Sequence, residues 1–108
     1  MFGPWEGDVE YMLTLKPEDF EPWVGRKVRV GTAPEPVEIT LASVVRLSPF
    51  RGRLDVREPF SMLFESPIEV YLVDATYQLD CGKNGPHEVL LTQLNPLPDR
   101  RVYEAVFA

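Results

Sequence analysis

The sequence has very few of the residues that staple small domains or bind soft metals. It contains a single cysteine, Cys81, and a single histidine, His87, among 108 residues. One cysteine cannot form a disulfide within the chain, so a disulfide-rich scaffold is excluded and a reducing compartment fits. A zinc site is disfavoured as well, because zinc normally takes about four nitrogen, sulfur or carboxylate ligands.

Long apolar runs and positive charge are also scarce. No apolar stretch approaches the roughly 20 residues that a membrane-spanning helix needs. The opening residues, Met-Phe-Gly-Pro-Trp-Glu-Gly-Asp, lack the basic and apolar regions of a signal peptide. Seventeen acidic residues against 11 basic residues give a net charge of -6, which opposes binding to nucleic acid or anionic membranes. We therefore expect a cytoplasmic protein without membrane association.

Proline and apolar residues are plentiful. The chain has 11 prolines and 44% hydrophobic residues, which favours short strands joined by turns over long helices. The length predicts a single domain over residues 1–108 with its own core. Within it, residues 1–13 form an aromatic N-terminal arm that includes Trp5. This arm either packs over an end or edge of the fold or docks a partner.

Alternation of apolar and polar residues predicts the strands. The clearest case is Phe60-Ser-Met-Leu-Phe64, in which Phe60, Met62 and Phe64 point to one face. The other strands are expected over residues 27–30, 37–47, 68–73, 76–81, 88–94 and 101–107. The last two are apolar on both faces, which favours a closed structure over a single open sheet.

Two further patterns carry structural expectations. Over residues 37–47, Val45 and Leu47 share the parity of Ile39 and are expected on the same face. Residues 15–25 are the only helical candidate, one or two turns long, expected to plug an end of the β-structure around Phe20. The sequence thus predicts an all-β fold. It is a small, mostly antiparallel barrel (or sandwich) of about seven short strands with one short helix near the N-terminus.

Several short motifs, in this order, resemble an uncharacterised family of short bacterial proteins, a domain of unknown function. They are Leu13-Thr14, Phe20, Val24-Gly25, Phe60-Ser-Met-Leu-Phe64, Pro67, Leu72, Tyr77-Gln-Leu79, Gly85, Val89–Leu91 and Tyr103-Glu-Ala-Val-Phe107. The chain departs from the family where a histidine often follows the Tyr-x-Leu, since Cys81 stands there. The resemblance implies no established activity. It implies genes that lie beside those for phage-tail-collar or tail-fibre-like proteins.

One basic and aromatic cluster stands out as a binding candidate. It lies in residues 46–57, and Arg100 and Arg101 could join it in space. The binding residues that we single out are Arg46, Phe50, Arg51, Arg53, Arg57 and, in the arm, Trp5. Such a loop on a small barrel can bind single strands of nucleic acid or a small ligand. Pairing of the arginines with acidic groups of the chain or of a protein partner is the favoured alternative.

The sequence offers few residues that could form a catalytic site. Cys81 and His87 flank the turn at residues 82–86 and could meet across a hairpin, but nothing supplies an orienting group or oxyanion donors. A structural thiol and a surface histidine are favoured instead. We expect a non-enzymatic interaction or structural accessory module without metal or cofactor. Its partner would be a protein, such as a tail-fibre or collar-type protein, and exposed strand edges would also permit a homo-oligomer.

Overall fold

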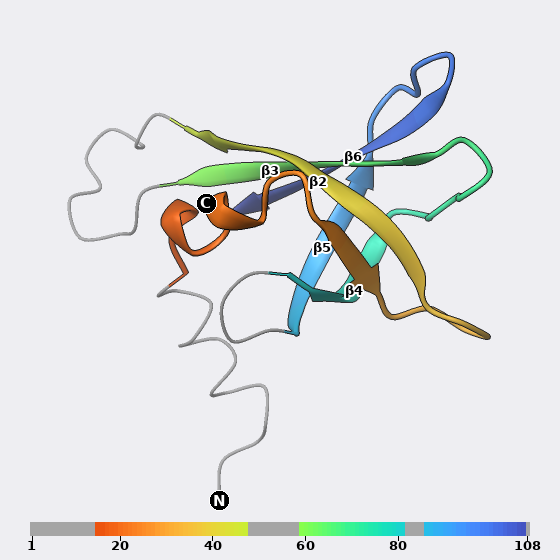
Figure 1. Cartoon of the computed structure of the whole chain (residues 1–108), viewed down its shortest axis with the longest axis horizontal. Helices are drawn as coiled ribbons and strands as arrows, with labels where there is room; N and C mark the ends of the chain where they lie inside the picture. The colour runs from red at the N-terminus through yellow and green to blue at the C-terminus, as the bar shows by residue number, and fades with distance from the viewer. Residues whose placement is uncertain (1–14, 48–58, 82–85, 108) are drawn as a thin grey trace, which may run out of the picture.

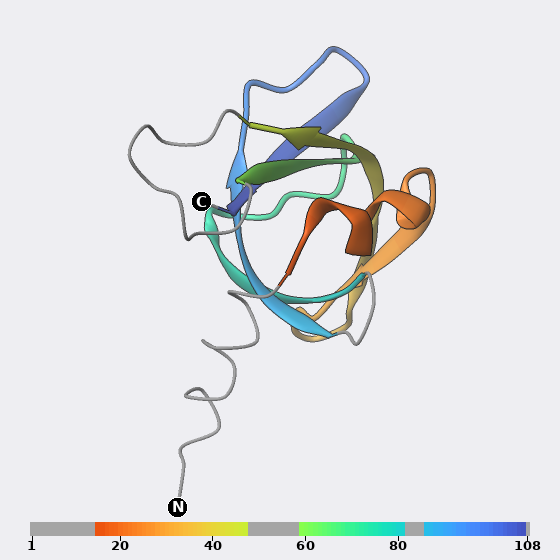
Figure 2. The same cartoon turned by 90° about the vertical axis from the view of Figure 1, so that its left-hand side faces the viewer.

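Six strands in the described residues form one closed antiparallel barrel (Figures 1 and 2). The structure is a computed structural model that describes residues 15–47, 59–81 and 86–107. Two consecutive 3₁₀ turns, η1 and η2, precede the strands. The elements are η1 (Pro17–Asp19), η2 (Glu21–Trp23), β1 (Lys27–Val30), β2 (Val37–Arg46), β3 (Phe60–Pro67), β4 (Ala75–Asp80), β5 (His87–Gln93) and β6 (Arg100–Phe107).

The barrel consists of two three-stranded meanders. Strands β1, β2 and β3 form one meander, and β4, β5 and β6 form the other, so the order around the barrel is β1-β2-β3-β6-β5-β4. The seam between β3 and β6 is long and runs from Phe60↔Phe107 to Pro67↔Arg100. The other seam, between β1 and β4, has only the pairs Arg29↔Asp80 and Val30↔Leu79. The predicted fold class, a mostly antiparallel all-β barrel, is confirmed.

The interior is filled by the residues that the alternation assigned to inward faces. Phe60, Met62 and Phe64 of β3 are completely buried, as predicted. Cys81, which directly follows β4, is buried, and the inward residues of the other strands include Val28, Val30, Ile39, Leu41, Leu79, Val89, Leu91, Tyr103, Ala105 and Phe107. Burial of this apolar surface is the main favourable term in folding. The sheet closes because every strand contributes apolar side chains to the same core.

A bulge in β2 corrects one prediction. The pairing with β3 shifts between Leu41 and Ser43, so one extra residue enters β2 and the inward parity changes. Beyond the bulge Val44 packs partly against the core, while Val45 is 40% exposed. Our expectation that Val45 and Leu47 share the face of Ile39 is therefore wrong, because simple alternation cannot register an inserted residue.

The last two strands are apolar on both faces, but only one face of each is buried. Leu90 of β5 and Val106 of β6 are 59% and 57% exposed on the outer wall. A single closed barrel buries one face of each strand, and among the described residues no second layer covers these two side chains. The two apolar faces of these strands favoured a closed fold, and the fold is closed. The outward apolar side chains are nevertheless exposed to solvent.

The predicted strand over residues 68–73 is a loop. Pro67 ends β3, and the Val70 N–H donates to the Pro67 carbonyl at 3.0 Å in a turn. Further along, the Leu72 N–H donates to the Tyr103 hydroxyl at 3.2 Å instead of joining a ladder. The alternation of Val70, Tyr71 and Leu72 imitates a strand, but the backbone hydrogen bonds of this segment go elsewhere.

The helical segment closes one end of the barrel, as predicted (Figure 2). Phe20, at the junction of η1 and η2, is 1% exposed. Its ring lies 5.8 Å from Phe60, 6.0 Å from Phe107 and 5.7 Å edge-on from His87, measured between centroids. Phe60 and Phe107 stack on each other at 4.7 Å. We call this the plugged end.

Candidate functional site

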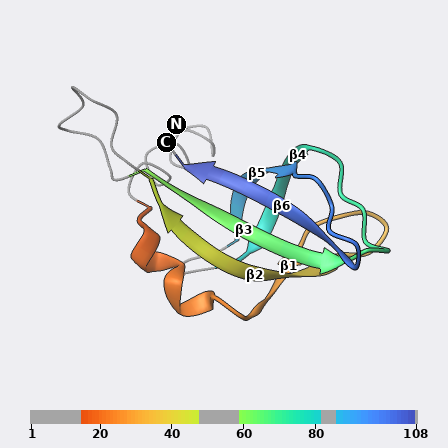
Figure 3. The same cartoon turned by 90° about the horizontal axis from the view of Figure 1, so that it is seen from above.

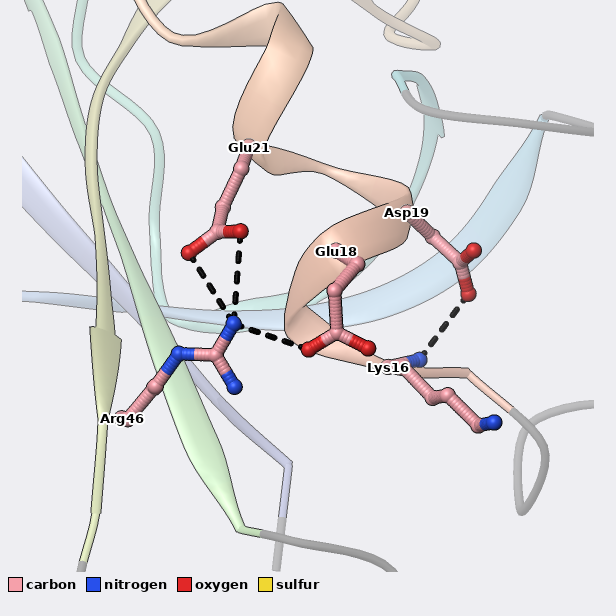
Figure 4. A network of polar contacts seen from close by, with 5 residues as sticks. All are labelled: Lys16, Glu18, Asp19, Glu21 and Arg46. Carbon is pink, nitrogen blue, oxygen red and sulfur yellow. Dashed lines mark hydrogen bonds and ion pairs between the residues drawn. The ribbon is translucent and has the colours of Figure 1, made fainter.

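Of the predicted binding residues, only Arg46 lies in the described part of the chain. Its Nη2 is 2.8 Å from Oε1 of Glu18 and 3.3 Å from both carboxylate oxygens of Glu21 (Figure 4). Arg46 therefore ties the end of β2 to η1 and η2, in line with the alternative that arginine pairs with acids of the chain. The other five, Phe50, Arg51, Arg53, Arg57 and Trp5, lie outside the described residues, as do the aromatic arm and most of the 82–86 turn.

Arg100 and Arg101 do not join Arg46. The register of β3 places Phe60 opposite Arg46 and Pro67 opposite Arg100, so the two arginines lie at opposite ends of the same strand. Arg100 instead pairs with Glu65 at 3.2 Å and with Asp99 at 3.1 Å. The expectation that Arg100 and Arg101 extend the Arg46 cluster is wrong, because antiparallel pairing carries the start of β6 to the far end of the barrel.

Cys81 and His87 both lie inside the plugged end. Cys81 is 1% and His87 is 4% exposed, so the expected surface histidine is in fact buried. Burial, with a smaller contribution from Asp80, raises the pKa of the Cys81 thiol to about 12. Cys81 is therefore protonated at neutral pH, which opposes a nucleophilic role. Among the described residues, no three His, Cys, Asp or Glu side chains gather so that they could hold a metal ion.

The end opposite the plug carries the connections 31–36, 68–74 and 94–99. In Figures 1 and 3 these connections extend together at the right-hand side, away from η1 and η2. We call this the loop end. It presents large apolar side chains to solvent: Tyr71 is 60% exposed and Val73 is 57% exposed. Large apolar groups at such a surface are typical of binding sites.

The loop 68–74 is held rigidly although it is not a strand. The Tyr103 hydroxyl, from a side chain buried in the barrel, donates to the Val70 carbonyl at 3.0 Å and accepts from the Leu72 N–H. The side chain of Leu72, a residue of this loop, is 4% exposed and belongs to the core cluster. Arg101 donates from Nε to the Ile68 carbonyl at 2.7 Å. The loop thus closes the second end of the barrel through hydrogen bonds to Tyr103 and Arg101 of β6.

Further contacts fix the side chains of this loop. The Arg101 guanidinium lies over the Tyr71 ring, 4.8 Å from its centroid, in a cation–π contact. The Tyr77 hydroxyl donates to the Val73 carbonyl at 2.8 Å. Burial, followed by the neighbouring Tyr103 and Asp74, raises the pKa of Tyr77, so its hydroxyl remains a donor at neutral pH. Asp74 accepts from the Gln93 N–H at 2.8 Å.

An open groove of about 560 Å³ runs between the loops 31–36 and 68–74. Its lining is mostly apolar and aromatic, with one carboxylate. The lining residues are Thr32, Ala33, Pro34, Glu35, Val37, Tyr71, Leu72, Val73 and Tyr77. In the wall formed by loop 31–36, the Thr32 hydroxyl donates to the Glu35 carbonyl and the Gly31 N–H donates to the Gln78 carbonyl. Both walls of the groove are therefore internally braced.

A family model covers nearly all of the described fold. It matches residues 15–107 and is described as a domain of unknown function, DUF6916. The chain belongs to this family. The match spans η1 through β6, so the DUF6916 unit coincides with the plugged barrel and includes the loop end. Searches of curated proteins and of solved structures found no match. In the part of the chain that the structure describes, no helix is long and apolar enough to cross a bilayer.

Sequence reasoning missed Tyr71, Val73 and Tyr77 as site residues. It assigned Tyr71 and Val73 to a strand and placed the candidate surface at residues 46–57, which begin at the plugged end. One signal was available: Pro67 precedes this segment and Asp74 follows it, so two residues that interrupt strands bracket it. The backbone of this segment is hydrogen-bonded by Tyr103 and Arg101 of β6, and this pairing could not be predicted from sequence spacing.

Proposed function

We propose that this protein is a non-enzymatic protein-interaction module that contacts its partner through the loop end. The observation that carries the proposal is the exposure of Tyr71 and Val73 on a loop whose backbone is fixed by the buried Tyr103. We place the protein in the cytoplasm. Its partner would be a protein, with the tail-fibre or collar type as the class that the family resemblance implies.

Rigidity is what makes these exposed side chains suitable for binding. Ordering a flexible loop and its side chains on association costs free energy, about 0.5–1.5 kcal/mol for each side chain that is immobilised. The loop 68–74 is already ordered in the folded protein, because Tyr103, Arg101 and Tyr77 form hydrogen bonds with its backbone. Less free energy is therefore needed to order it on binding. Exposed aromatic groups on a fixed scaffold are typical of interface centres.

The competing functions find less support in the described residues. A nucleic-acid site around Arg46 would need a free cation, and Arg46 is paired with Glu18 and Glu21. The chain as a whole carries a net charge of -6, which opposes phosphate binding. A homo-oligomer formed through strand edges stays a prediction, because the strands close into a barrel but the β1–β4 and β5–β6 seams have only two residue pairs each.

Affinity capture with matched surface variants tests the proposal. The loop variant is Tyr71→Thr/Val73→Thr, and the wall variant is Leu90→Thr/Val106→Thr, whose target residues have nearly the same exposure. Tagged wild-type protein should capture a protein partner from lysate of the source cells. The wall variant should retain that partner and the loop variant should lose it. Absence of any reproducible partner, or a partner retained equally by the loop variant, contradicts the proposal.

A further inference from the structure

We propose that the groove between loops 31–36 and 68–74 binds an extended, proline-containing peptide segment that carries a lysine or arginine. The groove lies within the loop end, so this inference rests on the proposed function and names the chemistry of the partner. Three properties of the groove lead to it: an aromatic and apolar lining, a backbone in which several groups are already hydrogen-bonded, and acidic charge at its rim.

The lining suits the ring faces of proline. Tyr71 and Tyr77 contribute aromatic surface, and Pro34 and Val37 contribute apolar surface on the other side. Grooves lined by aromatic residues bind proline-rich segments in the polyproline II conformation, which is already extended before binding and so loses little entropy. The exposed Tyr71 ring, held by Arg101, provides a fixed face for such a segment.

The backbone around the groove argues against recognition by strand addition. Strand addition needs a sheet edge with unpaired N–H and C=O groups. The barrel is closed, and the Leu72 N–H is bonded to Tyr103 while the Val73 carbonyl accepts from Tyr77. Across the groove, Pro34 and Pro36 have no N–H to donate. These bonded and missing backbone groups favour recognition through side chains, which is how proline-rich segments are read.

The acidic charge around the groove favours a lysine or arginine in the bound peptide. Glu35 is exposed in the lining, and Asp74 is exposed directly beside Val73. Among the described residues, the lining of the groove contains no basic residue, and the Arg101 guanidinium beside Tyr71 donates to the Ile68 carbonyl and lies over the Tyr71 ring. With an overall charge of -6 as well, the groove attracts a cationic segment and repels an acidic one.

The shape of the groove favours a peptide over a small metabolite. Pockets for small molecules enclose most of the ligand surface. This groove holds about 560 Å³ but is open along one side, so a small ligand would stay largely solvated. An extended segment can bind with one face in the groove and the other in water.

Selection from a displayed library of random 12-residue peptides on immobilised full-length protein tests the inference. Enriched peptides should contain proline together with lysine or arginine. Synthesised and labelled, one such peptide should bind wild-type protein in fluorescence anisotropy. Tyr71→Thr should weaken binding at least about tenfold through loss of the ring face. Glu35→Gln should weaken it about two- to fivefold, the size of an exposed ion pair, and should reduce its dependence on salt.

Two controls separate the outcomes. Leu90→Thr, on the outer wall, should leave the affinity unchanged, and circular dichroism should confirm that each variant is folded. Failure to enrich any peptide, enrichment without proline or basic residues, or binding that ignores Tyr71 overturns the inference. If that happens while the Tyr71→Thr/Val73→Thr protein still loses its captured partner, the proposed function stands and only the peptide chemistry is wrong. Capture that is unaffected by the same variant contradicts the proposed function itself.

Discussion

At the scale of single residues, burial decides what Cys81 can do. The sequence presents it beside a turn with His87 nearby, an arrangement that also occurs in catalytic pairs. In the barrel its side chain is part of the core, and desolvation raises the pKa of the thiol to about 12. The same residue that could have been a nucleophile on a surface is here a small apolar group.

The raised pKa of Cys81 predicts how stability depends on pH. The thiol of the unfolded chain ionises near the reference value of 9.0, whereas the folded thiol keeps its proton up to about 12. Over that range the unfolded state holds fewer protons, so stability falls as pH rises, by at most about 1.4 kcal/mol per pH unit from this group. Urea unfolding at several pH values should show the decrease, and Cys81→Ala should flatten it. An equal slope in both proteins would contradict this origin.

Thiol labelling gives an independent readout of the same residue. Because the folded thiol is buried and protonated, it should react slowly with a disulfide reagent at pH 8 and completely once the protein is unfolded. Rapid labelling of the native protein at pH 8 would place Cys81 at an accessible surface, contrary to the structure.

Tyr103 shows how one hydroxyl can order a loop. Tyr103→Phe keeps the ring in the core but leaves the buried Leu72 N–H without its acceptor. We expect a loss of about 1–3 kcal/mol in the free energy of unfolding, the cost of a buried unpaired donor. Tyr77→Phe is the matched control: it removes an exposed hydrogen bond to Val73 and should cost less than about 1 kcal/mol.

Urea unfolding and hydrogen exchange check this prediction together. In the Tyr103→Phe protein the Leu72 amide should exchange faster with solvent than in the wild type, while amides in the middle of β3 should change only as global stability does. Equal stability of the two Tyr→Phe variants, with unchanged exchange at Leu72, would show that the hydroxyl does not hold the loop.

At the scale of elements, the two ends of the barrel are closed by different means. At the plugged end, η1 and η2 insert Phe20 among Phe60, Phe107 and His87. At the loop end, the connection 68–74 inserts Leu72 and is held by Tyr103. The first plug is packed mainly through rings and the second is bonded through a buried hydroxyl. Both exclude water from one continuous core.

The plug of η1 and η2 should depend on Phe20 much more than on Arg46. Phe20→Ala removes a fully buried ring and should destabilise the protein by about 3–5 kcal/mol. Arg46→Gln breaks ion pairs whose side chains are roughly half exposed and should cost less than about 1 kcal/mol, with a smaller effect at high salt.

Urea unfolding at low and high salt measures both changes. Should Phe20→Ala fail to fold, Phe20→Leu provides the same test with a smaller expected loss of about 1–2 kcal/mol. A larger loss for Arg46→Gln than for the Phe20 variant would mean that the ion pairs, and not the ring packing, hold the plug.

At the scale of the whole molecule, a closed barrel with two plugged ends leaves its function to the rim. The buried side chains of one core cluster lie in the interior, as expected for a barrel of this small size. The described strands are paired into a ring, and the seams with the fewest pairs are β1–β4 and β5–β6, with two residue pairs each. The remaining described surface with exposed aromatic groups on a braced backbone is the loop end, which is why both proposals are placed there.

The sequence by itself determined the inward faces, the fold class and the plug. These follow from local patterns, since alternation at every second position and the i, i+3 spacing of Phe20 and Trp23 are properties of neighbouring residues. Nearly all inward residues of β1, β3, β4 and β6 were predictable for this reason. The errors arose where one residue changed the phase, as at the bulge after Leu41, or where a loop alternated like a strand, as at residues 68–73.

Only the tertiary structure decided where the candidate site lies. Tyr103 is 31 residues from Leu72 in the sequence, yet its hydroxyl fixes the loop that presents Tyr71 and Val73. Strand register likewise separated Arg100 from Arg46 by the length of β3. Such placements depend on which strands pair and in which register, and that choice minimises the free energy of the whole barrel and is not written in any short stretch of the chain.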